Sequence, residues 1–214
     1  MPKKTLMLSE VAYQELKERI AKLPSGSYLS ARQYAKDLGM SYTPIREAFL
    51  HLQKDGILRQ VPNVGFFVAS VDLADLIQVF QVRECIEVFS LQKVFQKLRP
   101  EHVEKLRKCC KEQRTAREKD DNYHYMAADA AFHRIPLELL GNTCLLGVYD
   151  NVRSQYTLCT SQLVQTLDDE VVKEHEKIIA CIEDKNMEQA LEMLREHIIN
   201  MKQRLLESYV NRND

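Results

Sequence analysis

The stretch Gly39-Met40-Ser41-Tyr42-Thr43-Pro44-Ile45-Arg46-Glu47-Ala48-Phe49 decides the fold of the first part of the chain. It reads as a turn with hydroxyl side chains that leads into a helix with an arginine near its start. Asp55-Gly56 then ends the helix, and Pro62-Asn63-Val64-Gly65 forms the tip of a short β-hairpin. This order of elements predicts a winged helix-turn-helix, the fold that lays one helix in the DNA major groove.

Two further helices are predicted before this one. The first spans Ser9–Lys22, with Ser9 as its N-cap and an inward stripe of Val11, Leu16, Ile20 and Leu23. The second runs from a cap at Ser30 to Leu38 and ends at Gly39. The third, residues 42–54, turns Ile45, Ala48, Phe49 and Leu52 inward, and residues 57–61 and 65–69 read as the two wing strands.

Beyond Ser70 the sequence is dominated by helical periodicity. Helices are predicted at about 72–97, 101–118, 122–140, 143–162, 168–184 and 187–209, with Gly141-Asn142 among the breaks. The fold class is therefore mainly α: a winged helix-turn-helix in residues 1–70 and an all-helical bundle in residues 71–214, joined by a short link at 69–72. Such a link lets motion in the bundle reach the DNA-binding part.

Composition agrees with this division. Of the 214 residues, 45% are hydrophobic and 29% charged, as in an ordinary helix-rich globule. Residues 1–70 carry ten Lys or Arg against six Asp or Glu, whereas the rest carries twenty against twenty-five. A basic front on an acidic body suits a protein that touches phosphates with one part only. Because no apolar run or signal peptide is evident, we expect a cytoplasmic location and no membrane partner.

The six cysteines form no zinc-finger or C-x-x-C spacing. In a reducing compartment they are expected to be free thiols. A redox sensor built on Cys109 and Cys110 is the alternative, and it requires an exposed, electropositive setting.

The start of the third helix holds the candidate base contacts. Arg46 is suited to bridge guanine O6 and N7, and Thr43 to take a phosphate or a base. Arg32 and the backbone of Gly65 are candidates for phosphate or minor-groove contacts. The expected DNA-binding residues are Arg32, Ser41, Tyr42, Thr43, Arg46 and Gly65. Taken alone, Arg46 could instead be an ordinary solvent-exposed side chain on the surface of the helix.

These motifs resemble the N-terminal domain of the GntR family of bacterial regulators. The resemblance rests on residues 26–32, on Ser41-Tyr42-Thr43-Pro44-Ile45-Arg46-Glu47-Ala48, on Asp55-Gly56 and on Asn63-Val64-Gly65. The family usually has a basic residue where this chain has Tyr42, which removes one phosphate or base contact.

A polar constellation lies on the inward stripes of three predicted helices. Asp129 and His133 are four residues apart and share one helix face, and His175 and His197 lie among apolar residues on the last two helices. Buried polar groups are costly unless they find partners. One explanation is that all four meet as ligands of a divalent ion such as zinc, nickel or manganese. The alternative is that each histidine is a core residue bonded to a neighbour.

Asp129-Ala130-Ala131-Phe132-His133, then Gly141-Asn142, His175 and His197, resemble the FCD-type effector domain of the FadR subfamily. The resemblance implies that Asp129, His133, His175 and His197 bind one divalent metal ion per chain. It also implies a homodimer and a small organic acid as effector. Arg83 is the residue that would pair with the effector's carboxylate, and a salt bridge to Glu87 one turn later is the alternative.

The sequence thus predicts a regulator that responds to a ligand and binds operator DNA as a homodimer. We expect a repressor that leaves the DNA when a small carboxylate binds at a metal site. A direct metal sensor and a bundle stapled by a structural metal are the rival interpretations. A metal-dependent hydrolase is less favoured, because no further inward Asp or Glu stands out as a general base. We therefore expect no enzyme and no catalytic residue.

Overall fold

The computed structural model describes residues 2–20, 22–55, 57–62, 64–69, 73–163 and 169–213. The chain divides into two compact units, Met1–Asp72 with Ser154–Gln162 and Leu73–Arg153 with Leu163–Asp214. Three features predicted from sequence lie outside the described residues: Gly56 as a helix stop, Asn63 in the wing, and the link at 70–72.

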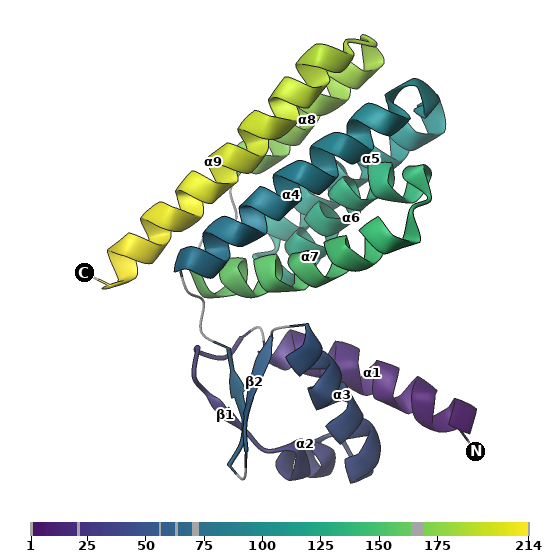
Figure 1. Ribbon diagram of the computed structural model, residues 1–214. Helices are drawn as coiled ribbons and strands as arrows, with labels where there is room; N and C mark the ends of the chain where they lie inside the picture. The colour runs from purple at the N-terminus through teal and green to yellow at the C-terminus, as the bar shows by residue number, and fades with distance from the viewer. Residues whose placement is uncertain are drawn as a thin grey trace. The chain divides into compact units, whose positions relative to one another are not determined.

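The helices of the first unit are α1 (Pro2–Ile20), α2 (Ala31–Asp37) and α3 (Tyr42–Lys54) (Figure 1). Two predictions for α1 were wrong. The helix begins at Pro2 rather than Ser9, since proline is well suited to a first turn and the Lys and Leu residues that follow favour helix. Val11 is 54% exposed, because the buried stripe runs through Ala12, Leu16 and Ile20 instead.

The predictions for α2 and α3 were confirmed. The Ser30 hydroxyl caps α2 by accepting a hydrogen bond from the Gln33 amide at 3.4 Å. On α3, the inward stripe of Ile45, Ala48, Phe49 and Leu52 has no exposed surface. The spacing of these residues places them on one face, so the opposite face of α3 is left to solvent.

The wing is part of a three-stranded antiparallel sheet of order β1-β3-β2. Strands β2 (Leu58–Val61) and β3 (Gly65–Val68) form the expected hairpin, with Val61 opposite Gly65. Strand β1 (Tyr28–Leu29) pairs with Phe67 and Phe66 of β3 and was not predicted. Two residues are too few to show a strand period, so sequence carries no signal for it.

The second unit is built from helices, although residues 154–162 of α7 belong to the first unit. Their bounds are α4 (Leu73–Val94), a short 3-10 turn η1 (Phe95–Lys97), α5 (Pro100–Glu118), α6 (Asn122–Leu140), α7 (Thr143–Leu163), α8 (Asp169–Glu183) and α9 (Met187–Asn213). These bounds agree with the predicted ranges to within a few residues, and the all-helical prediction is confirmed. Gly141 ends α6 in the left-handed conformation with φ of 72°, which glycine adopts without strain.

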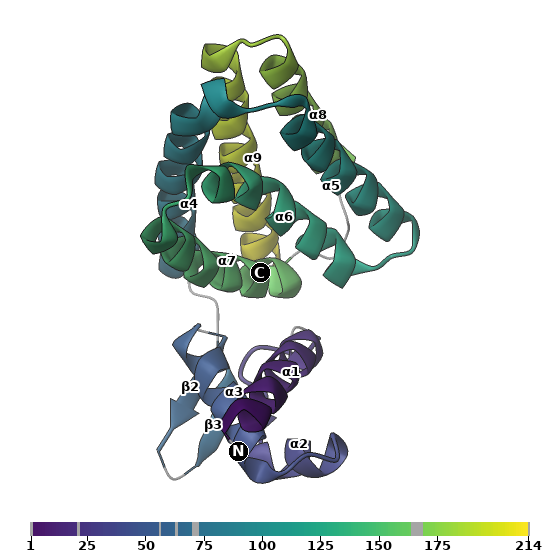
Figure 2. The same ribbon diagram turned by 90° about the vertical axis from the view of Figure 1, so that its right-hand side faces the viewer.

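Five of these helices form a closed ring. Helix α4 packs on α6, α6 on α5, α5 on α8, α8 on α9, and α9 on α4 again, as the view in Figure 2 shows. Inward residues of all five helices therefore reach the same interior. Within the described residues, no helix is both long and apolar enough to cross a membrane.

Phe49 is the expected weak point of the first unit. Its ring has no exposed surface and lies edge-on to Phe66 and Tyr34, with centroids 5.0 and 5.7 Å away. Phe49→Ala should lower the free energy of unfolding by about 3–5 kcal/mol, because it leaves a cavity that α3 cannot collapse. Chemical denaturation followed by circular dichroism measures it. Tyr42→Ala, at a 46% exposed position, is the control and should change stability by less than about 0.5 kcal/mol.

Candidate metal centre and DNA-binding face

The four predicted ligands meet in the interior of the helical ring. Asp129 and His133 come from α6, His175 from α8 and His197 from α9, and all four are buried. One ligand atom from each lies within 4.8 Å of all the others. The Nε2 atoms of His175 and His197 are each 3.2 Å from Nε2 of His133. The Asp129 carboxylate lies 3.6 Å from His175 Nε2 and 3.9 Å from His133 Nε2.

The other ring nitrogen of each histidine is held by an acceptor. His133 Nδ1 lies 2.8 Å from Glu87 of α4, and His197 Nδ1 lies 2.8 Å from Glu174 of α8. His175 Nδ1 lies 2.9 Å from the Gln113 side-chain oxygen of α5. Ionised carboxylates only accept hydrogen bonds, so the Nδ1 atoms of His133 and His197 carry the protons, and we assign His175 likewise. All three Nε2 atoms then point at one another.

Such a convergence fits a metal ion. Three bare nitrogens repel one another unless a cation or proton lies between them, and outer acceptors on Nδ1 are the usual way in which metal-bound histidines are oriented. Two nitrogens bound to one ion at about 2.0–2.1 Å lie about 2.8–3.4 Å apart at octahedral to tetrahedral angles. The observed Nε2–Nε2 distances of 3.2 Å fall in that range. The distances from the Asp129 oxygen to Nε2 of His175 and His133, 3.6 and 3.9 Å, are slightly longer.

Electrostatics favour the metal-binding form of His175, His197 and Asp129. Burial, together with the charges of His197 and His133, holds the pKa of His175 well below its ordinary value. Burial also lowers the pKa of His197, although its bond to Glu174 opposes the shift. Burial would raise the pKa of Asp129, but Arg153 and His133 outweigh it and lower the pKa. Neutral imidazoles and an ionised carboxylate are the species that coordinate a cation.

Two buried arginines stand next to this group. Arg83 of α4 donates to Glu87 through Nε at 2.7 Å, so the alternative predicted for Arg83, a salt bridge to Glu87, is present. Glu87 then joins Arg83 to His133. Arg153 of α7 is paired with Asp129. Both arginines are less than a tenth exposed, so the centre is bounded by two buried ion pairs.

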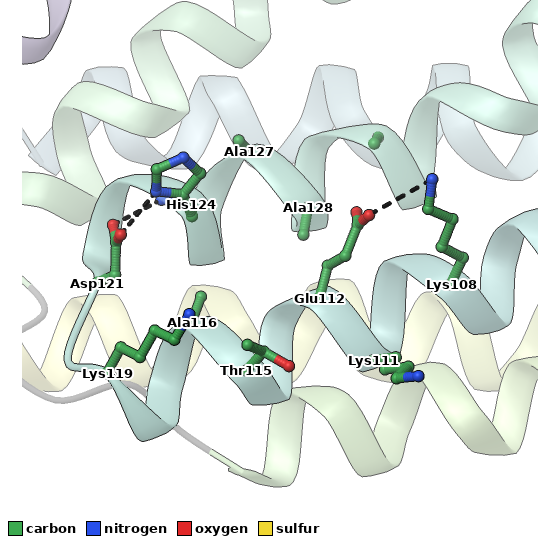
Figure 3. A pocket seen from close by; sticks show the side chains of 11 residues that line it. Lys108, Lys111, Glu112, Thr115, Ala116, Lys119, Asp121, His124, Ala127 and Ala128 are labelled. Carbon is green, nitrogen blue, oxygen red and sulfur yellow. Dashed lines mark hydrogen bonds and ion pairs between the residues drawn. The ribbon is translucent and has the colours of Figure 1, made fainter.

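One small cavity lies beside the centre. A cavity of about 20 Å³ lies next to Glu87 and His133, walled by apolar side chains such as Phe132 and Ile178. It has room for about one water molecule. A larger groove of about 700 Å³ opens on the surface between α5 and α6 (Figure 3). Its rim carries Lys108, Lys111 and Lys119, and none of the four candidate ligands lines it.

The cysteines show no redox pair within the described residues. Cys85, Cys109, Cys110, Cys144 and Cys181 are free; the side chain of Cys159 lies outside the description. Burial raises the pKa of Cys109 to about 11 and that of Cys110 to about 12. Both are therefore thiols at neutral pH, which disfavours a redox sensor at this position.

The first turns of α3 present a polar outer face. Ser41, Tyr42, Thr43 and Arg46 are exposed, whereas Pro44 and Ile45 between them are buried. The Ser41 side chain makes no capping hydrogen bond. Arg32 is exposed on α2.

Gly65 stands at the start of β3 with φ of 148°, and a Cβ there would lie 2.6 Å from the Tyr28 ring. A side chain at this position would therefore be strained and crowded. The glycine thus lets the hairpin turn close against Tyr28.

Sequence reasoning missed the outer partners of the centre. Glu87, Gln113 and Glu174 were not singled out as polar partners of histidines, and Arg153 was not among the predicted site residues. Each of these residues lies one to two helical turns from apolar residues of the same helix. Their burial was not predicted, because a carboxylate or amide on a helix is most often exposed to solvent. The available signal was the helical phase of Glu87, which lies four residues after Arg83.

The fold and these two sites define a DNA-binding regulator with a helical ligand domain. Residues 8–68 match "Bacterial regulatory proteins, gntR family", and residues 78–200 match "FCD domain". The chain belongs to the GntR-family transcription regulators with an FCD domain. Regulators of this family bind operator DNA and typically dimerise, and FCD domains can bind a metal and make regulation ligand-responsive.

Similar proteins agree. The uncharacterized HTH-type transcriptional regulator YdhC of Bacillus subtilis is 25% identical over 86% of this chain and 85% of its own. A probable D-xylose utilization operon transcriptional repressor of Paenarthrobacter nicotinovorans is 25% identical over 83% and 78%. The solved structure of E. coli McbR/YncC has a TM-score of 0.82 at 22% identity, covering 96% of this chain and 98% of that one. The first two are named as a regulator and a repressor, and the third shows the same fold.

The two depressed histidine pKa values predict a stability that depends on pH. In the unfolded chain His175 and His197 take up protons near pH 6.5. In the folded, metal-free protein they take up protons less readily, because their pKa values are lowered. The unfolded state then binds more protons, so the free energy of unfolding should fall between pH 7 and 5, by up to about 1.4 kcal/mol per pH unit for each histidine.

Urea denaturation in the presence of a chelator at pH 7, 6 and 5 measures this dependence. The buried carboxylates titrate below the pH range of 5 to 7. Despite burial, the hydrogen bonds of Glu174 lower its pKa to about 2, so its contribution to the free energy of unfolding is lost only at pH values below about 4.5. His197→Gln should make the free energy of unfolding less dependent on pH. An equal slope in that variant would contradict the assignment.

Proposed function

We propose that this protein is a repressor that leaves its operator when a small organic acid binds beside a divalent metal ion. Asp129, His133, His175 and His197 would hold one zinc, nickel or manganese ion per chain. The protein would act as a homodimer and, because it works on DNA, in the bacterial cytoplasm. The observation that carries the proposal is the buried Asp and three-His group bounded by two ion pairs.

The charge balance favours an anionic effector. Arg83 and Glu87 cancel each other, as do Arg153 and Asp129. A divalent cation added to this group leaves two positive charges in a buried place, which is costly without a counter-ion. A carboxylate supplies that counter-ion, and a bound metal would offer it an open coordination position as a Lewis acid.

Arg83 is the residue that we expect to receive the acid. Its guanidinium is buried and already faces a carboxylate, with Nε and Nη2 at 2.7 and 3.5 Å from the two oxygens of Glu87. An effector carboxylate offers the same pair of acceptors. Arg153, on the other side of the ligand group, is a second candidate.

The small cavity couples binding to movement. A cavity of about 20 Å³ beside His133 has room for about one water molecule, so an organic acid that occupies it must push the surrounding helices apart. A ligand that binds only the opened arrangement shifts the protein toward it. Because the half-sites of an operator have fixed spacing, a changed spacing or angle of the two DNA-binding units weakens binding.

The DNA contacts are proposed from exposure and chemistry. Arg46 and Thr43 would reach base edges, and Ser41, Tyr42, Arg32 and the backbone at Gly65 would contact phosphates or the minor groove. Arg59 adds a cation on the wing strand β2, where it lies 6.0 Å from the Phe67 ring centroid. It was not among the residues predicted from sequence.

Fluorescence anisotropy tests the proposal. A duplex is first selected from random DNA by the protein itself, and its affinity is then measured with zinc, nickel or manganese and a panel of small mono- and dicarboxylic acids. At least one acid should weaken binding by about 5–150-fold. His175→Ala with His197→Ala should abolish that response, whereas Arg46→Ala should weaken DNA binding with or without acid.

Other outcomes separate the rivals. Affinity that changes with metal alone, in the absence of any acid, would identify a direct metal sensor. A lower melting temperature of His197→Ala together with an unchanged acid response would identify a structural metal. An affinity for the selected duplex that changes neither when the metal is chelated nor when any of the acids is added would refute the mechanism.

A further inference from the structure

The groove between α5 and α6 has a basic edge and a floor of small side chains (Figure 3). Lys108 and Lys111 come from α5 and Lys119 follows its last residue, and all three are exposed. The alanines that line the groove are Ala116, Ala127, Ala128 and Ala131. Since an alanine side chain ends at Cβ, the two helices leave a volume of about 700 Å³ open above this floor.

The arginines of α5 are compensated by the helix on its other side. Helix α5 packs on α6 and on α8. Arg107 and Arg114 each lie 2.6 Å from a carboxylate of α8, and Arg117 lies 3.1 Å from a third. Helix α6, by contrast, contributes only His124 and alanines to the groove. It therefore supplies no carboxylate to the lysines along the edge.

The lysines of the groove are left with excess positive charge. Lys108 lies 3.7 Å from Glu112 of its own helix. In the part of the chain that the structure describes, no carboxylate lies within ion-pair distance of Lys111 or Lys119. Asp121 at the end of the groove is held by His124, through Nδ1 at 2.6 Å and the backbone amide at 3.1 Å. The groove thus combines an apolar floor with two ammonium groups that lack a counter-ion.

We propose that this groove binds an acidic, amphipathic helix of a partner protein. Lys108 and Lys119 are eleven residues apart, which is about 16 Å or three turns of helix. Over that length, apolar side chains at every third or fourth position of the partner would fill the alanine floor, as in other helix-in-groove contacts. Carboxylates along one edge of the partner helix would meet the lysines.

Three other occupants fit the groove less well. A second copy of this chain, placed with two-fold symmetry, would gather lysines from both copies around one axis, and like charges across an interface are unfavourable. A small anion would neutralise a lysine but leave most of the alanine floor uncovered. A DNA duplex offers phosphates and no apolar side chains for that floor. The inference goes beyond the response to metal and acid, because none of the candidate metal ligands lines the groove.

Selection from a library of displayed random peptides tests the inference with the full-length protein. The peptides have about 16 residues, enough for about four turns of helix. Peptides that also bind the Ala127→Leu, Ala131→Leu double variant are removed first. Both alanines are exposed on α6, and leucine favours helix, so this variant should fold with its groove filled. Ala180→Leu, at an exposed position of α8, is the matched control and should bind every selected peptide.

The remaining peptides should be acidic, with apolar residues at every third or fourth position. The tightest peptide is then synthesised with a fluorescent label, and its affinity is measured by anisotropy with a chelator present, so that the result does not depend on the metal centre. Lys111→Glu and Lys119→Glu should each weaken binding by about three- to tenfold. Lys177→Glu, an equal change at an exposed position of α8, should have no effect. Circular dichroism should show that the peptide gains helix on binding.

Several results would overturn the proposed partner. A selection that leaves no peptide after the depletion step would do so, as would peptides without acidic residues or an affinity that the two lysine substitutions do not change. An operator affinity that falls in the same two variants would assign the lysines to DNA instead.

Discussion

Three imidazole nitrogens and one carboxylate aimed at a single point are the constraint on which the helical unit depends. Each histidine is fixed by an acceptor behind it, His133 by Glu87, His175 by Gln113 and His197 by Glu174. All five helices of the ring contribute a ligand or an acceptor. The three nitrogen lone pairs repel one another when no cation lies between them. The free energy of this arrangement of the five helices therefore depends on whether a cation occupies the centre. Such dependence is what a ligand-responsive regulator requires.

Helix α4 joins that centre to the outside. On its inner side Glu87 contacts both His133 and Arg83, and on its outer side Ile77 and Phe89 are exposed. A rigid helix that is pushed at one face moves at the other, since packed interiors do not deform continuously. In the proposed mechanism, an acid that separates Glu87 from Arg83 would thus move α4.

Helical periodicity predicted most of the fold, because an inward stripe every three to four residues survives in any tertiary context. It failed where the pattern is short or locally ambiguous: β1 has two residues, and Val11 competes with Ala12 for the buried stripe of α1. Asp129 and the histidines could be grouped because buried imidazoles are unusual. Glu87, Gln113, Glu174 and Arg153 could not, since polar residues are common on helices and only tertiary packing turns these four inward.

The metal content of purified, tag-free protein tests the centre most directly. After incubation with zinc, nickel or manganese and gel filtration, elemental analysis should give about one equivalent per chain for the wild type. The His175→Ala, His197→Ala double variant should retain little, whereas the control His124→Ala, whose ring pairs with Asp121 at 2.6 Å, should bind as the wild type does. Absence of metal from the wild type, or equal content in the double variant, would contradict a metal centre built on these residues.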